Sequence, residues 1–224
     1  MKKFKPSPQL KPLPQEIWYV IASFCDIEAL YTLIYTSIVK SVNYKKLSDT
    51  CHERLELAKR AYILIQKYKK EFPKGDPVTI ACQKGRLNDL KTFIQSRTVK
   101  DVHTYEGKTS SGNAYTLLGI ASRYEQYEIV QYLLSLPGMD VGVADNDGRT
   151  AIMYAAANNE KNLDLIKSLL NHKTCSIDAV NKIITWGGTA LDYAKNWNDG
   201  PLQNEIIQLL KSKGAEESNY EDDY

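Results

Sequence analysis

The sequence predicts an all-α protein, in which a helical N-terminal segment and a long linking helix precede a stack of repeated helix pairs. Two observations predict this fold class. Four segments that begin at Asp76, Thr116, Thr150 and Thr189 can be superimposed, although their starts lie 34 to 40 residues apart. Within each segment, apolar residues recur at spacings of three and four, as in helices that bury one face. A repeat of this length predicts an elongated core that neighbouring helix pairs share.

The first 48 residues do not share the pattern of the repeated segments. Residues 1–12 are polar and proline-rich, so we expect a flexible lead. Residues 13–44 are predicted to form a compact helical hairpin, because Pro14 suits the first turn of a helix and apolar residues follow at helical spacing. These positions are Ile17, Ile21 and Phe24 in the first helix and Leu30 and Leu33 in the second.

A third and longer helix is predicted over residues 45–75. Ala58, Tyr62 and Ile65 keep a three-or-four spacing until Phe72-Pro73-Lys74-Gly75 ends the pattern. We expect this linking helix to close the N-terminal end of the stack. Its many lysines indicate a solvated face, with contact to an anionic surface as the lesser alternative.

The stack itself is expected to cover residues 76–215 in about four units. Each unit has a small residue in its first helix, where a neighbouring helix must approach closely; these residues are Ala81, Ala121, Ala155 and Ala194. Residues 216–224 carry five acidic residues and no basic one. We expect this acidic tail to be disordered, because it has too little apolar surface to offset the entropy of ordering.

The repeated segments resemble the ankyrin repeat. The family's TPLHxA signature is echoed in Asp76-Pro77-Val78, Thr116-Leu117-Leu118, Thr150-Ala151-Ile152 and Thr189-Ala190-Leu191. The signature His is replaced by Thr79, Gly119, Met153 and Asp192, so the repeats are degenerate. The resemblance implies a protein-binding module that uses hairpin tips and the ends of the first helices. Position by position, it implies that the target-binding residues are Gln83, Lys84, Arg123, Tyr124, Asn146, Asp147, Arg149, Asn158, Trp186, Asn196 and Trp197.

The N-terminal segment resembles an F-box, because Leu13-Pro14-Gln15-Glu16-Ile17 matches the family's LPxEI opening. An F-box implies docking to the Skp-family adaptor of a cullin-RING ubiquitin ligase. The implied adaptor-binding residues are Leu13, Pro14, Ile17, Ile21, Phe24, Leu30 and Leu33. The alternative is a plain helical cap, in which residues such as Leu33 and Ile34 pack against the linking helix.

The connection from Gln95 to Tyr115 is long, and loops of this length are often functional. It contains Gly-Lys-Thr at 107–109, but a phosphate-binding loop requires a glycine where Val102 stands. We therefore expect no nucleotide site. A binding or modification loop and plain disorder remain as alternatives.

Composition and motifs exclude several other classes. The formal net charge is only +2, which does not favour a nucleic-acid partner. The four cysteines form no zinc or disulfide pattern, and we find no catalytic motif, so we expect no metal, no cofactor and no enzymatic activity. We also expect no membrane span and a cytoplasmic location.

These observations predict a substrate-receptor subunit of a Skp-cullin-F-box ubiquitin ligase, in which one end holds the adaptor and the other holds a target protein. Such an architecture in a short chain resembles viral or bacterial effectors, and this origin would place the protein in the host cytosol. The alternative function is an ankyrin interaction module that has no connection to ubiquitin. The oligomeric state is left open, and a monomer within a hetero-complex is expected.

Overall fold

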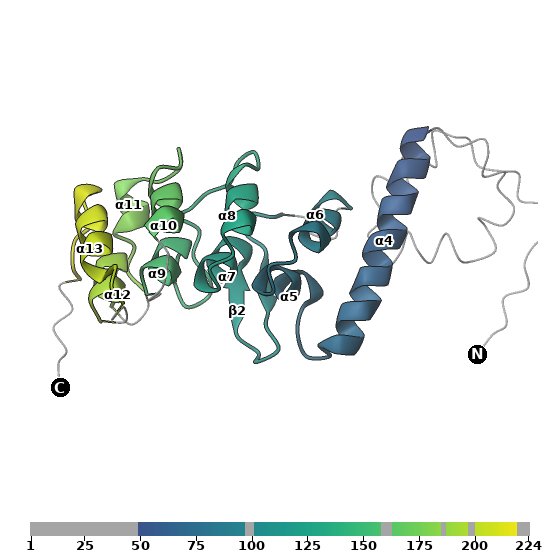
Figure 1. The fold of residues 1–224 in the computed structure, drawn as a ribbon, viewed down its shortest axis with the longest axis horizontal. Coiled ribbons are helices and arrows are strands. Elements are labelled where there is room, and N and C mark those ends of the chain that lie inside the picture. Colours follow the sequence, from purple (N-terminus) through teal and green to yellow (C-terminus); the bar gives the residue numbers. More distant parts are fainter. Residues whose placement is uncertain (1–48, 97–100, 158–162, 185–186, 197–199, 219–224) are drawn as a thin grey trace, which may run out of the picture.

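The computed structural model describes residues 49–96, 101–157, 163–184, 187–196 and 200–218. Within them the chain forms ten helices and one two-stranded sheet. The helices follow one another in chain order along the long axis of the molecule, from α4 at one end to α13 at the other (Figure 1). The predicted all-α fold class is confirmed, with the two three-residue strands as an addition. The segment 13–44, which was expected to dock an adaptor, lies outside the described residues.

The stack consists of an inner and an outer row of helices (Figure 1). The inner helices are α5 (Pro77–Gln83), α7 (Leu117–Arg123), α9 (Ala151–Ala156) and α12 (Ala190–Asn196). The outer helices are α6 (Leu87–Gln95), α8 (Tyr127–Leu134), α10 (Leu163–Leu170) and α13 (Gln203–Ser212), and the short α11 (Ile177–Val180) precedes α12. Helix α7 packs between α5 and α9, and α9 packs on α12. None of the described helices has both the length and the apolar character needed to cross a membrane.

The inner helices pack closely because they share two sequence features. Each begins at a side chain that accepts a hydrogen bond from the backbone N–H three residues later; these side chains are Asp76, Thr116, Thr150 and Thr189. Such a cap contributes about 1 kcal/mol to helix stability. Each helix also carries one of the four small residues noted in the sequence, Ala81, Ala121, Ala155 and Ala194, and all four are fully buried. One continuous apolar core therefore runs through the stack.

Helix α4 (Asp49–Glu71) closes the N-terminal end of the stack by packing on α5 and α6. The Tyr68 ring meets the edge of the Phe93 ring at a centroid distance of 5.9 Å, and its hydroxyl donates a hydrogen bond to Asp89. The guanidinium of Arg86 lies over the same Tyr68 ring, 5.1 Å from the ring centre. Aromatic packing and these polar contacts together hold α4 against α6.

Two hairpin-like loops, which we call fingers, project from the inner row. The first finger, residues 106–116, consists of β1 (Glu106–Lys108), a turn and β2 (Ala114–Thr116), with Gly107 opposite Tyr115 in an antiparallel pair. A Cβ atom at Gly107 would lie 1.9 Å from the Thr79 hydroxyl, so only glycine lets this finger lie against α5. The second finger, residues 144–150, is closed by an antiparallel bridge between Ala144 and Thr150.

The C-terminal residues 214–218, which we call the strap, run back across the last helix pair. Asn181 donates to the carbonyl of Gly214 and accepts from the backbone of Glu216. The Asp192 carboxylate accepts a hydrogen bond of 3.0 Å from the backbone of Ser218. Residues 216–218 belong to the tail for which composition predicted disorder; they are ordered here because polar groups of the last repeat bind their backbone. Residues 219–224 lie outside the described part.

Candidate functional site

A groove of about 580 Å³ opens between the two fingers and continues over the ends of α7 and α9. We call it the interfinger groove. It is lined by side chains from both fingers, from the last turn of α7, from α9 and from α12. The lining residues are Asn113, Ala114, Tyr115, Arg123, Tyr124, Asp147, Arg149, Tyr154, Ala157 and Tyr193. The groove therefore crosses three consecutive helix pairs, so its shape depends on how the repeats stack.

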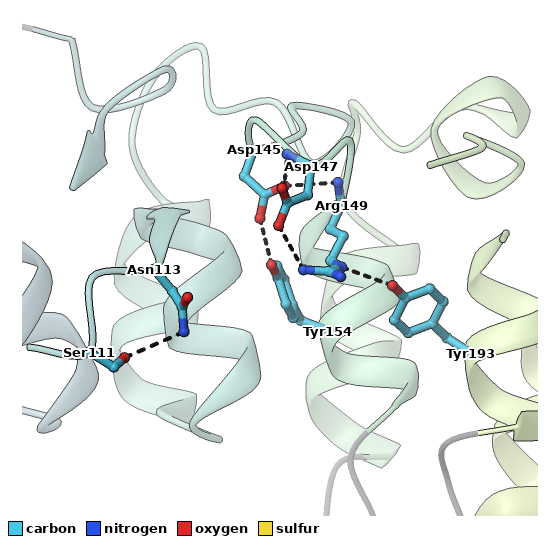
Figure 2. Close-up of polar contacts among 7 residues, drawn as sticks. All are labelled: Ser111, Asn113, Asp145, Asp147, Arg149, Tyr154 and Tyr193. Atoms are coloured by element: carbon cyan, nitrogen blue, oxygen red, sulfur yellow. Dashed lines mark hydrogen bonds and ion pairs between the residues drawn. The ribbon is translucent and has the colours of Figure 1, made fainter. Parts of the chain in front are cut away.

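The second finger is built around the buried carboxylate of Asp145, which is only 6% exposed. One carboxylate oxygen accepts hydrogen bonds of 3.0 Å from the backbone N–H groups of Asp147 and Arg149. The other accepts a hydrogen bond of 2.5 Å from the Tyr154 hydroxyl (Figure 2). Burial raises the pKa of Tyr154, and the hydrogen bond to Asp145 raises it further. Three donors thus satisfy one buried charge and fix the finger to α9.

Arg149 extends from this finger across the groove wall (Figure 2). Its Nη1 atom lies 2.8 Å from the Asp147 carboxylate, and its Nε–H donates a 2.9 Å hydrogen bond to the Tyr193 hydroxyl. Burial alone would lower the pKa of Arg149, but hydrogen bonds to Tyr193 and Tyr154 raise it above its ordinary value. The guanidinium is therefore charged and held in one orientation, between the second finger and α12.

Arg123 and two tyrosine rings form the floor of the groove. The Tyr115 and Tyr154 rings are 5.4 Å apart between centroids, and the Arg123 guanidinium lies 5.7 Å from each of them. A cation in this position over aromatic rings is stabilised by about 0.5–1 kcal/mol at an exposed site. Beside it, Tyr124 at the C-cap of α7 is 40% exposed. The floor thus offers one positive charge near two aromatic rings and one accessible aromatic surface.

The tip of the first finger is ordered by its own polar contacts. The backbone carbonyl of Asn113 accepts a 2.9 Å hydrogen bond from the backbone N–H of Thr109. The side-chain hydroxyls of Thr109 and Ser111 are 2.8 Å apart. The Asn113 amide donates to Ser111 at 3.4 Å, as Figure 2 shows. The second part of the long connection between α6 and α7 is therefore a shaped hairpin that forms one wall of the groove.

The carboxylate of Glu106 is influenced by two carboxylates of the second finger, Asp145 and Asp147. Glu106 in β1 does not line the groove. Burial raises its pKa, and the negative charges of Asp145 and Asp147 raise it further. In contrast, Asp147 is the only acidic side chain among the lining residues, and it is paired with Arg149.

The structure brings together four of the target-binding residues expected from the sequence: Arg123, Tyr124, Asp147 and Arg149. Four others lie elsewhere. Gln83 accepts a hydrogen bond through its carbonyl from Gln126, the Lys84 amine lies 5.8 Å from the Phe72 ring centre, and Asn146 and Asn196 are exposed but do not line the groove. The remaining three, Asn158, Trp186 and Trp197, lie outside the described residues.

Sequence reasoning missed Tyr115, Tyr154 and Tyr193, which supply the aromatic walls of the groove. They lie in or beside helices whose neighbouring positions are apolar, and this pattern does not indicate that they line a groove. A signal was present in the sequence: Tyr154 and Tyr193 both stand four residues after a capping threonine, where the earlier units have Ile80 and Ile120. A tyrosine repeated at that position indicates that this face of the inner helix is polar in the last two repeats.

The arrangement is suited to binding. Among the described residues, no three side chains of His, Cys, Asp or Glu are placed to hold a metal ion. Aromatic rings and arginines line the groove instead, and these residue types carry much of the energy in protein interfaces.

A comparison with protein families agrees with the repeat structure. The family model for ankyrin repeats, in three copies, matches residues 117–221, which contain the helix pairs α7–α8, α9–α10 and α12–α13. Ankyrin repeats are thus present in this part of the chain, and they are a non-enzymatic module for protein–protein interaction. No F-box is detected. No curated protein matches the chain.

Proposed function

We propose that this protein is a binding scaffold that captures a segment of a partner protein in the interfinger groove. The observation that carries the proposal is the groove itself, whose charged and aromatic side chains are fixed by the Asp145, Arg149 and Tyr154 contacts before any partner binds. Preorganised side chains favour affinity, because less conformational entropy is lost on binding. The size of the groove suits a few residues of an extended chain.

Ankyrin repeats support the same reading, because their interaction role matches a groove that spans several repeats. A partner lying across three helix pairs would contact both fingers and the ends of the inner helices. The outer helices would then serve only to hold the inner row in place.

The experiment compares two tyrosines whose side chains are almost equally exposed to solvent, although only one of them lies in the groove. Tyr124 lines the groove and is 40% exposed, whereas Tyr127 begins α8, does not line the groove and is 43% exposed. A photo-crosslinking phenylalanine analogue is introduced at each position in the full chain, and the crosslinked partners from the native cell are identified by mass spectrometry.

We expect one protein to crosslink strongly at position 124 and weakly at position 127. Its purified form should then bind the native chain, and Tyr124→Ala should raise its Kd at least about tenfold while Tyr127→Ala leaves it unchanged. Equal crosslinking at both positions, or equal effects of the two alanine variants, would argue against a groove-centred function.

A second candidate function is that of a substrate receptor in a Skp-cullin-F-box ubiquitin ligase. The observation that favours it is the pentapeptide Leu13-Pro14-Gln15-Glu16-Ile17, which resembles the start of an F-box. In this proposal residues 13–44 hold the ligase adaptor, and the groove holds the protein to be ubiquitinated. The scaffold would act by raising the effective concentration of the target near the ligase.

This candidate is tested with a purified Skp-family adaptor. Stable co-elution with the full chain on size exclusion, lost in the double variant Pro14→Ala and Ile17→Ala, would support the ligase function. A chain that elutes alone, with its thermal unfolding unchanged by the adaptor, would leave the groove-binding scaffold without a link to ubiquitin.

A further inference from the structure

Helix α4 has one face that the repeat stack does not cover. Its opposite face is buried against the stack at Ala58, Ala61, Ile65 and Tyr68. Ile63 stands two residues from both Ala61 and Ile65, which corresponds to about 200° of rotation around an α-helix, so its side chain points away from the stack. It is 64% exposed and is the most exposed large apolar side chain among the described residues.

Basic residues surround Ile63 on this outward face. Arg60 precedes it by three positions and Lys67 follows it by four, so both lie next to it on the helix surface. Both are exposed, and within the described part of the chain no carboxylate pairs with either of them. Residues 59–70 contain five basic residues and no acidic one. The outward face of α4 therefore combines a bare aliphatic side chain with positive charge.

The chain's own residues 13–39 have the complementary composition. They contain three acidic residues, Glu16, Asp26 and Glu28, and no basic one. Their apolar residues recur at helical spacing in both halves of the segment, and a hairpin of two such short helices is too small to bury all of them against itself. The segment therefore offers an apolar surface and negative charge together.

The connection between this segment and α4 is long enough for the two to meet. Residues 40–48 span about 30 Å when extended, at about 3.3 Å per residue. Ile63 lies only about 21 Å from the start of α4 at Asp49, since an α-helix rises about 1.5 Å per residue. A second copy of the chain is a poorer occupant, because two basic faces would then lie against each other.

We propose that residues 13–39 fold back on the outward face of α4 and cover Ile63, with their acidic side chains beside Arg60 and Lys67. The segment then forms one further layer at the N-terminal end of the stack. A partner protein that binds the same side of the segment must first displace it from α4. This inference concerns α4 alone, so its failure would leave the proposed function of the interfinger groove untouched.

The test measures backbone hydrogen exchange of residues 13–39 in the full chain by mass spectrometry. Ile63→Asp places a charge at the centre of the outward face. Ile183→Asp is the matched control, because Ile183 is 58% exposed and lies between α11 and α12, near the other end of the stack. A further variant combines Arg60→Glu with Lys67→Glu, which reverses the charge of the face and keeps Ile63. Light scattering gives the mass of each sample in solution.

We expect residues 13–39 to exchange at least about tenfold faster in Ile63→Asp and in the charge-reversed variant than in the native chain, and at the native rate in Ile183→Asp. Exchange in α7 to α13 should stay unchanged, which shows that the stack remains folded. If Ile63→Asp also loosens α5 and α6, the charge-reversed variant decides, because it removes no apolar contact.

Two results would overturn the inference. Equal exchange of residues 13–39 in the native chain and in the variants of the outward face would show that α4 does not hold the segment. A dimeric mass, with protection that falls on dilution, would show that a second copy of the chain covers Ile63 instead.

Discussion

Arg149 in the second finger and Tyr193 in α12 are joined by a hydrogen bond of 2.9 Å, in which the arginine Nε–H donates to the tyrosine oxygen. The two residues belong to consecutive repeats, and both line the interfinger groove. The bond therefore links the shape of the groove to the stacking of α12 on α9.

Replacing Tyr193 by Phe removes the acceptor but keeps the ring. We expect the free energy of unfolding to fall by only about 1 kcal/mol, because one hydrogen bond of ordinary strength is lost. Partner affinity should fall more than this loss of stability suggests, since Arg149 loses the contact that ties it to α12. Urea denaturation and titration with the crosslinked partner measure the two effects. Tyr127→Phe, which changes no groove residue, is the matched control; an equal loss of affinity in that variant would contradict the link.

Tyr154→Phe should destabilise the protein more than Tyr193→Phe does. It removes one of three donors to the buried Asp145 carboxylate, and hydrogen bonds to charged groups contribute about 1.5–3 kcal/mol. Chemical denaturation followed by circular dichroism gives the difference. If both variants lost equal stability, Asp145 would not be the organising charge of the second finger.

The turn between α7 and α8 contains a backbone strain that a single substitution should relieve. Glu125 has a φ of 55°, in the left-handed region, whereas the turn between α5 and α6 has Gly85 there with a φ of 69°. We expect Glu125→Gly to raise the free energy of unfolding by about 0.5–1 kcal/mol, after the flexibility of glycine in the unfolded chain is subtracted. Gly85→Ala should lower it, because its Cβ would meet Gln126. Thermal unfolding of both variants checks the opposite signs.

The strap should make stability depend on acid pH through Asp192. Burial alone would raise the pKa of Asp192, but hydrogen bonds from the Thr189 and Ser218 backbone outweigh it and lower the pKa. A carboxyl with a lowered pKa stabilises the folded state above its unfolded value, near pH 4, and that contribution is lost as pH falls through the folded value.

We therefore expect Asp192→Asn to cost about 1 kcal/mol at pH 7 and progressively less below pH 4, since solvent partly screens this site. Denaturation curves recorded between pH 7 and pH 2.5 provide the test. A cost that stayed constant across this range would show that the charge of Asp192 does not hold the strap.

The helix pairs could be predicted from the sequence because their signals are local. A capping residue, a small residue such as Ala121 and an apolar stripe such as Ile129, Val130 and Leu133 recur in order, and each fixes a helix and its buried face. The place of Asp147 and Arg149 in a finger could also be predicted, since they belong to a hairpin turn whose position the repeat determines.

The groove walls could not be predicted in the same way. Tyr154 and Tyr193 lie one turn after a cap, next to alanines that are fully buried, and the sequence pattern does not show that their hydroxyls reach Asp145 and Arg149. Such contacts join residues 9 and 44 positions apart in the chain. The order of residues 216–218 escaped prediction for the same reason, because Asn181, Thr189 and Asp192 bind their backbone.

Hydrogen exchange of the backbone amides, with and without the crosslinked partner, tests the central claim most directly. If the partner lies in the interfinger groove, protection should increase in residues 111–115, in residues 145–149 and around Arg123, while the outer helices α8 and α10 keep their rates. Protection confined to α8, α10 or α4, with unchanged exchange in both fingers, would contradict the account.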